Sequence, residues 1–149
     1  MMGSLTLQGR PTPPDPRWSV PLGVSLTPQG GGPPVNCTPT TDQSGNFTCS
    51  GLLPGVYTGC VKHSHTLQSC QNVTLASGPN VVNFGTLPEG DATDDNCVTL
   101  VDFSILVTSF GNCTGDIGFD ARADFNDDGC VGLVDFSLLV TNFGKCGDV

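Results

Sequence analysis

The sequence predicts a two-part molecule: a small antiparallel β-sandwich over residues 1–88, followed by a pair of loop–helix repeats over residues 89–149. Three observations lead to this fold class. The first part contains about seven short strand-like runs separated by proline and glycine turns. The second part contains one stretch twice at a constant offset, so that Asp91 corresponds to Asp124 and Cys97 to Cys130. The charge divides almost at the same point: residues 1–89 are neutral, and residues 90–149, with eleven aspartates against two basic residues, supply the net charge of −9.

The strands of the first part are short, and turn residues bound each of them. Four prolines between Arg10 and Arg17 interrupt strand pairing. Asp42 to Gly45 predicts a tight turn that leaves Phe47 pointing inward. The expected strands are Leu5–Gly9, Trp18–Thr27, Val35–Thr41, Asn46–Leu52, Val56–His63, Thr66–Leu75 and Val81–Leu87.

The eight cysteines predict disulfides and an oxidising compartment. Zinc is the rival interpretation, but the chain has no C-x-x-C pair and only two histidines. Cys37 and Cys49 flank the turn at residues 42–45, and Cys60 and Cys70 flank a turn near residues 64–66. We expect cross-strand disulfides Cys37–Cys49 and Cys60–Cys70, each closing a hairpin and contributing about 2–4 kcal/mol.

Each repeat begins with a twelve-residue loop, residues 91–102 (loop 1) and 124–135 (loop 2). Loop 2 has acidic or amide side chains at positions 1, 3, 5 and 12 and Gly129 at position 6, which suits a hard cation that takes six to eight oxygens. Asn96 replaces the glycine in loop 1, and Thr93 is a poorer ligand than Asn126, so we expect two calcium sites of which the first is weaker. The expected ligands are Asp91, Thr93, Asp95, the Cys97 carbonyl, Thr99 and Asp102 in loop 1, and Asp124, Asn126, Asp128, the Cys130 carbonyl, a water near Gly132 and Asp135 in loop 2.

Without metal the carboxylates of each loop repel one another, so we expect calcium to be a folding requirement as well as a ligand. An amphipathic helix follows each loop, over Leu100–Phe110 and Leu133–Phe143, and a glycine ends it. Each helix is roughly 16 Å long, which rules out the disulfides 97–113 and 130–146.

The repeats resemble the type I dockerin family over roughly residues 90–146. The resemblance rests on the paired loops, on the aspartates Asp102 and Asp135 at position 12, and on the shared Val-Asp-Phe-Ser run. It implies a non-catalytic module that binds a cohesin-like receptor. It also implies antiparallel helices, which favour the disulfides Cys97–Cys146 and Cys113–Cys130 over 97–130 and 113–146.

The same resemblance implies a partner surface at loop positions 10 and 11 and along the following helix. These positions are apolar here, unlike the hydroxyl pairs of many cellulosomal dockerins, so a standard cellulosomal cohesin does not fit well. Core packing between the helices is the alternative, and we expect it to take at least half of the apolar positions. The residues concerned are Leu100, Val101, Val107, Thr108, Leu133, Val134, Val140 and Thr141.

The first part resembles the carboxypeptidase regulatory-like and B-type collagen-adhesin repeat domains over roughly residues 3–87. The resemblance rests on the segment from Asp42 through Phe47 to the Pro54-Gly55 turn and Tyr57. It implies a transthyretin/Ig-like sandwich that serves as a spacer, a stalk or an adhesion module.

Other function classes find little support. The acidic balance argues against nucleic acid, and no apolar run is long enough for a bilayer. His63 and His65 fall in a turn without a catalytic constellation, and we expect exposed turn residues there. The first ten residues lack the apolar core of a signal peptide. Four Asn-x-Thr acceptors predict candidate glycan sites at Asn36, Asn46, Asn72 and Asn112.

These observations predict a secreted, non-enzymatic, calcium-stabilised surface protein that acts through protein–protein contacts. Two hypotheses stay open. In one, the repeats dock onto a separate receptor and the sandwich is a spacer. In the other, the chain assembles with copies of itself into a filament or surface layer, for example through strand addition at an exposed Leu5–Gly9 strand.

Overall fold

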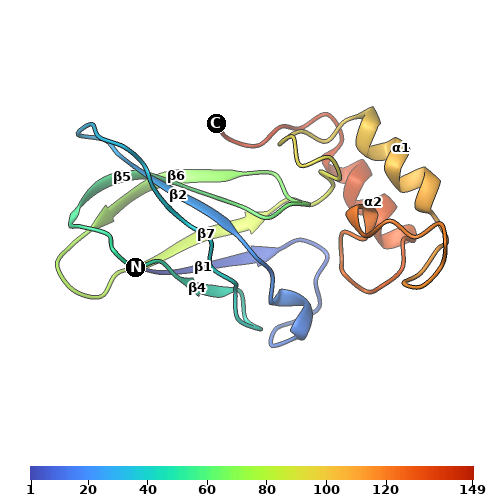
Figure 1. Cartoon of the computed structure of the whole chain (residues 1–149), viewed down its shortest axis with the longest axis horizontal. Coiled ribbons are helices and arrows are strands. Elements are labelled where there is room, and N and C mark those ends of the chain that lie inside the picture. Colours follow the sequence, from blue (N-terminus) through green and yellow to red (C-terminus); the bar gives the residue numbers. More distant parts are fainter.

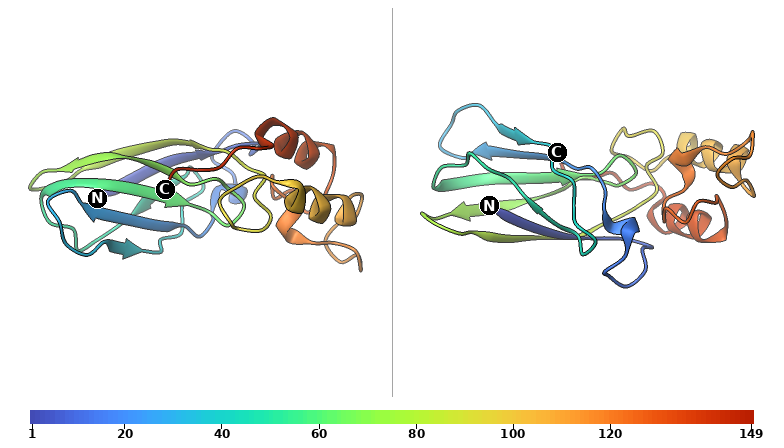
Figure 2. Two further views of the ribbon diagram at one scale, coloured as in Figure 1. Left: turned by 90° about the horizontal axis from the view of Figure 1, so that it is seen from above. Right: turned by 60° about the horizontal axis from the view of Figure 1, so that its bottom comes forward.

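The computed structural model describes all residues, 1–149. The chain forms two units, and the helical unit is joined to one end of an elongated sandwich (Figure 1). The N-terminus lies toward the opposite end of the sandwich (Figure 2). Both α-helices have ten residues, and no helix is long and apolar enough to span a membrane.

Seven strands form the two sheets of the sandwich, as expected. The three-stranded sheet has the order β4-β1-β7 and the four-stranded sheet the order β3-β2-β5-β6. All pairings are antiparallel except that of β1 with β7, which run parallel. The strands are β1 (Met2–Leu7), β2 (Gly23–Pro28), β3 (Val35–Cys37), β4 (Asn46–Thr48), β5 (Gly55–Lys62), β6 (Ser69–Leu75) and β7 (Val81–Leu87).

The sandwich prediction is confirmed, but three of its details change. The first strand starts at Met2 and is central in its sheet, so it offers no free edge for strand addition. Trp18 lies in a short 3-10 helix, η1 (Pro16–Trp18), before β2 begins. The edge strand β3 is short and has no buried residue, whereas the central strand β5 alternates and turns Tyr57 and Val61 toward the core.

Two disulfides hold the sandwich, and they join the pairs expected from the sequence. Cys60 and Cys70 lie directly opposite each other on β5 and β6. Cys37 and Cys49 do not close a hairpin, because Cys37 ends β3 in one sheet and Cys49 follows β4 in the other. The second disulfide therefore links the two sheets rather than two neighbouring strands.

The second unit contains two helices, α1 (Leu100–Ser109) and α2 (Leu133–Asn142), and a short 3-10 helix, η2 (Ala121–Ala123). Each α-helix ends before a Phe-Gly pair, whose glycine has a φ of 85° after α1 and 79° after α2. The core of this second unit contains Val98, Leu106, Phe125, Val131 and Leu139.

The junction between the two units is closely packed. Gly9 follows β1, has a φ of 78°, and lies so near α2 that an added Cβ would stand 2.6 Å from Leu138 Cδ1. Leu67, which belongs to the sandwich by sequence, packs in the core of the helical unit. The two units, which the sequence divides between residues 88 and 89, therefore share a continuous packed interface.

Candidate functional site: two acidic loops and an apolar helical face

In both loops the residues at positions 1 and 12 are buried carboxylates that hold the loop backbone. Asp124 Oδ1 and Oδ2 accept hydrogen bonds from the amides of Asp128 and Gly129 at 3.1 and 2.9 Å. Asp135 accepts from the amides of Phe125, Asn126 and Gly132 at 2.7, 3.2 and 2.8 Å. These contacts fold loop 2 around its own acidic groups.

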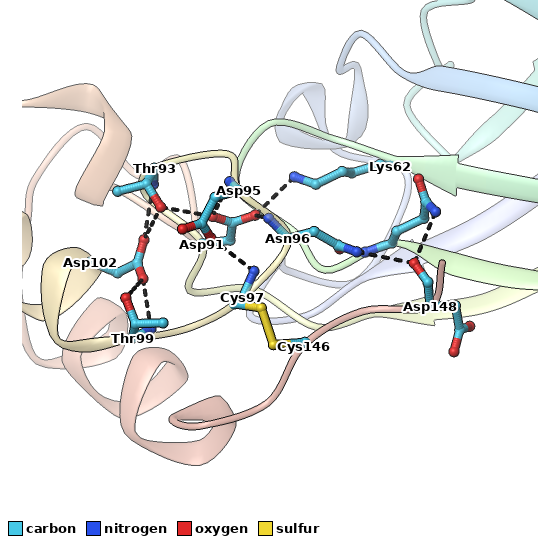
Figure 3. Close-up of a disulfide and its surroundings, with 11 residues drawn as sticks. Lys62, Asp91, Thr93, Asp95, Asn96, Cys97, Thr99, Asp102, Cys146 and Asp148 are labelled. Carbon is cyan, nitrogen blue, oxygen red and sulfur yellow. Dashed lines mark hydrogen bonds and ion pairs between the residues drawn. A yellow bond between two sulfur atoms is a disulfide. The ribbon is translucent and has the colours of Figure 1, made fainter.

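Loop 1 has the same pattern at the equivalent positions. Asp91 accepts from the amides of Asp95 and Asn96 at 3.1 and 2.9 Å. Asp102 accepts from the amides of Thr93 and Thr99 at 2.9 and 2.7 Å, and the contact with Thr99 completes a capping box at the start of α1. Figure 3 shows these side chains converging beside the disulfide of Cys97.

The tight turn of each loop uses left-handed backbone at positions 4 and 6. Asp94 and Asn96 have φ values of 60° and 70°, and Asp127 and Gly129 have values of 55° and 90°. Asparagine and aspartate tolerate this conformation better than other non-glycine residues. Asn96 therefore replaces glycine in loop 1 without a different loop shape.

The oxygen atoms that each loop offers are of the type that binds a calcium ion. The pKa of Asp124 is raised to about 6, chiefly by burial and to a lesser extent by the neighbouring Asp135 carboxylate. Burial also raises the pKa of Asp135. A divalent cation would relieve both effects. No group of three or more His, Cys, Asp or Glu side chains gathers around one point, so amide, hydroxyl and peptide oxygens would have to complete either site. The calcium sites stay a prediction.

Two disulfides tie the loops to the opposite repeat. Cys97 is bonded to Cys146 after α2, and Cys113 after α1 is bonded to Cys130. These are the pairs that the sequence analysis favours. A backbone contact accompanies each bond, since Gly144 N donates to Val98 O and Gly111 N donates to Val131 O, both at 2.8 Å.

The expected partner residues lie on the surface of the helical pair. Leu100, Val101 and Val107 are 54–66% exposed, and their equivalents Leu133, Val134 and Val140 are 47–76% exposed. The expectation that half of them pack in the core is therefore wrong. The hydroxyls of Thr108 and Thr141 are satisfied by the carbonyls of Ser104 and Ser137 in the preceding turn.

Four of these side chains, Leu100, Val107, Leu133 and Val140, line two apolar grooves that the repeat relates to each other. One groove, of about 440 Å³, lies between Leu106 and Val107 of α1, Phe110 directly after it, and Leu133 and Phe136 of α2. The other, of about 550 Å³, has the equivalent lining with the helices exchanged, plus Phe136. We call the surface that contains both grooves the apolar helical face. It is an exposed apolar patch of the kind that marks a binding surface.

Sequence reasoning missed the polar contacts that fix the helical unit to the sandwich. The Gln8 side-chain oxygen accepts from Asn142 Nδ2 at 2.6 Å and from the Glu89 amide at 3.1 Å. Asp148, near the C-terminus, accepts from Cys70 N at 2.8 Å and from Gln68 Nε2 at 2.9 Å. These residues come together only where the two units pack against each other.

The histidines also differ from expectation, because they belong to this junction and are not exposed turn residues. His63 is buried, and its Nδ1 lies 2.9 Å from the Pro21 carbonyl oxygen. His65 meets the ring of Phe125 edge-on, with centroids 6.2 Å apart.

No protein-family model and no curated protein matches the chain. Two solved structures are similar over nearly the whole length. Both are mutants of a type II Cohesin-X-Dockerin complex from Acetivibrio cellulolyticus, one a C-terminal and the other an N-terminal interface mutant. The TM-scores are 0.70 and 0.68, each at 20% identity and covering 98% of this chain and 96% of that chain. At this identity the likeness shows the fold.

These comparisons correct the family assignment. The assignment to the type I dockerin family, preceded by a carboxypeptidase regulatory-like or collagen-adhesin sandwich, is wrong: no model of those families matches, and the similar chains come from a type II complex. The description of the helical pair as a dockerin EF-hand pair depended on that assignment and is not supported. The expectation of a cohesin-like receptor rested on it as well and loses its basis.

Proposed function

We propose that the chain is a non-catalytic, extracellular protein–protein docking module. The observation that carries the proposal is the apolar helical face, where the exposed side chains of Leu100 and Val107 in the first repeat recur as Leu133 and Val140 in the second. An exposed apolar surface of this extent favours a protein partner that covers it. The four disulfides, with no free cysteine, support an oxidising extracellular setting.

The solved structures of similar fold support a protein partner, because both are described as complexes between protein modules. We propose that the partner is a separate folded protein with an apolar contact surface. Self-assembly is the alternative. The central position of β1 removes the strand-addition route to self-assembly but leaves the apolar helical face as a contact.

We further propose that loops 1 and 2 each bind calcium and so hold the face in shape. Each loop leads directly into a helix of the face, and its position 12 carboxylate lies in the first turn of that helix. On binding, Asp91, Asp95 and Asp102 in loop 1 and Asp124, Asp128 and Asp135 in loop 2 would close around the ion. The amide, hydroxyl and peptide oxygens between them would complete each site. Bound calcium would neutralise the carboxylates that otherwise repel one another.

The proposal is tested by surface plasmon resonance with the oxidised chain. Type II cohesin and type II X-dockerin modules are immobilised in parallel, and sedimentation velocity of the chain alone measures self-association. We expect one immobilised module to bind in millimolar calcium and to release the chain after chelation. Val107→Asp and Val140→Asp together should weaken binding by about a hundredfold or more, as loss of two central apolar contacts implies.

The matched control places the same change on exposed apolar residues of the sandwich. Leu53 and Val81 are 74% and 75% exposed, and Leu53→Asp with Val81→Asp should leave binding unchanged. If the chain self-associates and the face variants abolish that self-association, the partner is a second copy of the chain and not a separate protein. Absence of both hetero-binding and self-association would refute the proposed docking function.

A further inference from the structure

Two basic side chains of the sandwich reach the two loops at equivalent positions. Lys62, at the end of β5, lies with its Nζ 2.5 Å from Asp94 Oδ1. Arg10, which follows β1, lies with its Nη1 3.3 Å from Asp127 Oδ2. Asp94 and Asp127 both occupy position 4 of their loops. The sandwich therefore supplies one cation to each loop.

The two cations differ in what else they contact. Lys62 Nζ also donates to Asp91 Oδ2 at 2.9 Å, and Asp91 is fully buried at position 1 of loop 1 (Figure 3). Arg10 instead has Glu89, outside loop 2, as its second carboxylate, at 3.7 Å. Asp124, at position 1 of loop 2, forms no ion pair. Only loop 1 has a fixed positive charge beside its position 1 carboxylate.

We infer that Lys62 is a resident cation of loop 1, which keeps residues 91–102 folded in the absence of calcium, whereas loop 2 depends on the ion. This inference rests on the calcium binding proposed above. A buried carboxylate is costly unless it is paired, and a charge-assisted hydrogen bond is among the stronger pairings available. Lys62 provides that pairing at Asp91, and in loop 2 only calcium can provide it at Asp124.

The same contact weakens loop 1 as a calcium site. An ion held by Asp91 would lie close to the ammonium group, and like charges repel more strongly in a partly buried setting than in water. Loop 1 thus stays folded without calcium and binds it weakly. Loop 2 needs calcium to stay folded and binds it more tightly. When calcium is withdrawn, the molecule should open at loop 2 and keep loop 1 on the sandwich.

Amide hydrogen exchange by NMR on the full oxidised chain tests the inference, because the loops offer equivalent reporters. The amides of Asp95 and Asn96 donate to Asp91, and those of Asp128 and Gly129 donate to Asp124. In chelator we expect the loop 2 pair to lose protection and the loop 1 pair to keep it. Lys62→Met in chelator should lower protection of the loop 1 pair by about ten- to a hundredfold, the effect of one hydrogen bond to a charged group.

Two further variants separate charge from structure. Lys62→Arg should keep most of the loop 1 protection, and Lys62→Gln, a milder change that also removes the charge, should lower it as Lys62→Met does. Arg17→Met is the matched control, because Arg17 is bonded only to Asp15 within the sandwich, and it should change neither loop.

Equal loss of protection in both loops of the wild-type chain on chelation would overturn the inference. Unchanged loop 1 protection in Lys62→Met and Lys62→Gln would overturn it as well. Failure of calcium binding has a different signature, since calcium would then add no protection to loop 2 of the wild-type chain. The Lys62 comparison is made in chelator, so its outcome does not depend on that result.

Discussion

Arg10 and Glu89 are two charged residues whose side chains have no solvent exposure. Their closest atoms are 3.7 Å apart, and neither group forms a hydrogen bond. Burial raises the pKa of Glu89 to about 8, although Arg10 opposes the rise. Residues of this type are rarely fully buried without a partner, so the junction depends on keeping both of them in place.

His65 makes stability depend on pH. Its pKa is lowered from 6.5 to about 4, chiefly by burial and to a lesser extent by the neighbouring His63. Above pH 6.5 both folded and unfolded chains hold His65 neutral. Between pH 6.5 and about 4 the unfolded chain takes up the proton first, so the free energy of unfolding falls as the pH is lowered, by about 2 kcal/mol at pH 5.

Urea unfolding of the wild-type chain and of His65→Gln at pH 7.0 and 5.0 measures this effect. The wild-type chain should lose about 2 kcal/mol more than the variant between the two values. Protonation of the loop carboxylates contributes to both chains and cancels in the comparison. Equal losses in the two chains would show that His65 does not cause the pH dependence.

At the scale of the element, each loop and its helix form one unit through the position 12 carboxylate. Asp135 accepts three backbone N–H groups of loop 2 and lies in the first turn of α2, where a negative charge is favourable. We expect Asp135→Asn to lower the calcium stoichiometry measured by isothermal titration calorimetry from two ions to one.

Asp102→Asn is the matched change in loop 1. It should also leave one ion bound, and the ion that remains should bind more tightly than the one remaining in Asp135→Asn, because loop 2 has the better ligand set. Two bound ions in Asp135→Asn would contradict the assignment of Asp135 as a ligand.

The elements also show what the sequence could and could not predict. The internal repeat located both loops and both helices, because each is a local structure whose residues are close in the chain. The central place of β1 was missed, because its partners β4 and β7 lie far along the chain and either edge or centre fits the same short strand. Cys37 and Cys49 could be paired by their spacing, but the sheets that they join could not.

The polar contacts of the junction were missed for the same reason. Lys62 is far from Asp91 in the chain, and Gln8 and Asn142 lie near its opposite ends. No periodicity in the chain connects such residues. The burial of His63 follows from this docking as well, so the local pattern indicated only a turn. The sequence could not predict that the apolar helical face is exposed to solvent. An amphipathic helix shows the same spacing of apolar residues whether its own chain or a partner covers them.

For the whole molecule, the junction predicts that the two units unfold together. Arg10→Met removes the buried guanidinium that contacts Glu89 and Asp127 and leaves the Glu89 carboxyl buried without a polar partner, so we expect the free energy of unfolding to fall by about 1–3 kcal/mol. Trp18, the only tryptophan, reports the sandwich by fluorescence, and far-ultraviolet circular dichroism reports the helices. The two signals should show one coincident transition in the wild-type chain and two separate transitions in Arg10→Met.

The control is again Arg17→Met, which removes a partly exposed pair with Asp15 and should leave the free energy of unfolding nearly unchanged. Separate transitions already present in the wild-type chain would show that the junction does not couple the units.

The parallel pairing of β1 with β7 has a mechanical consequence. The chain enters β1 near the far end of the sandwich, and β7 leaves at the end where the helical unit begins (Figure 1). Tension applied between the N-terminus and the helical unit pulls these neighbouring strands in opposite directions along their length. Their hydrogen bonds then bear the load together instead of opening one at a time, and the Cys97–Cys146 disulfide joins the first repeat to the segment after α2, which limits extension of the helical unit. A chain built in this way resists extension between its N-terminus and its helical unit.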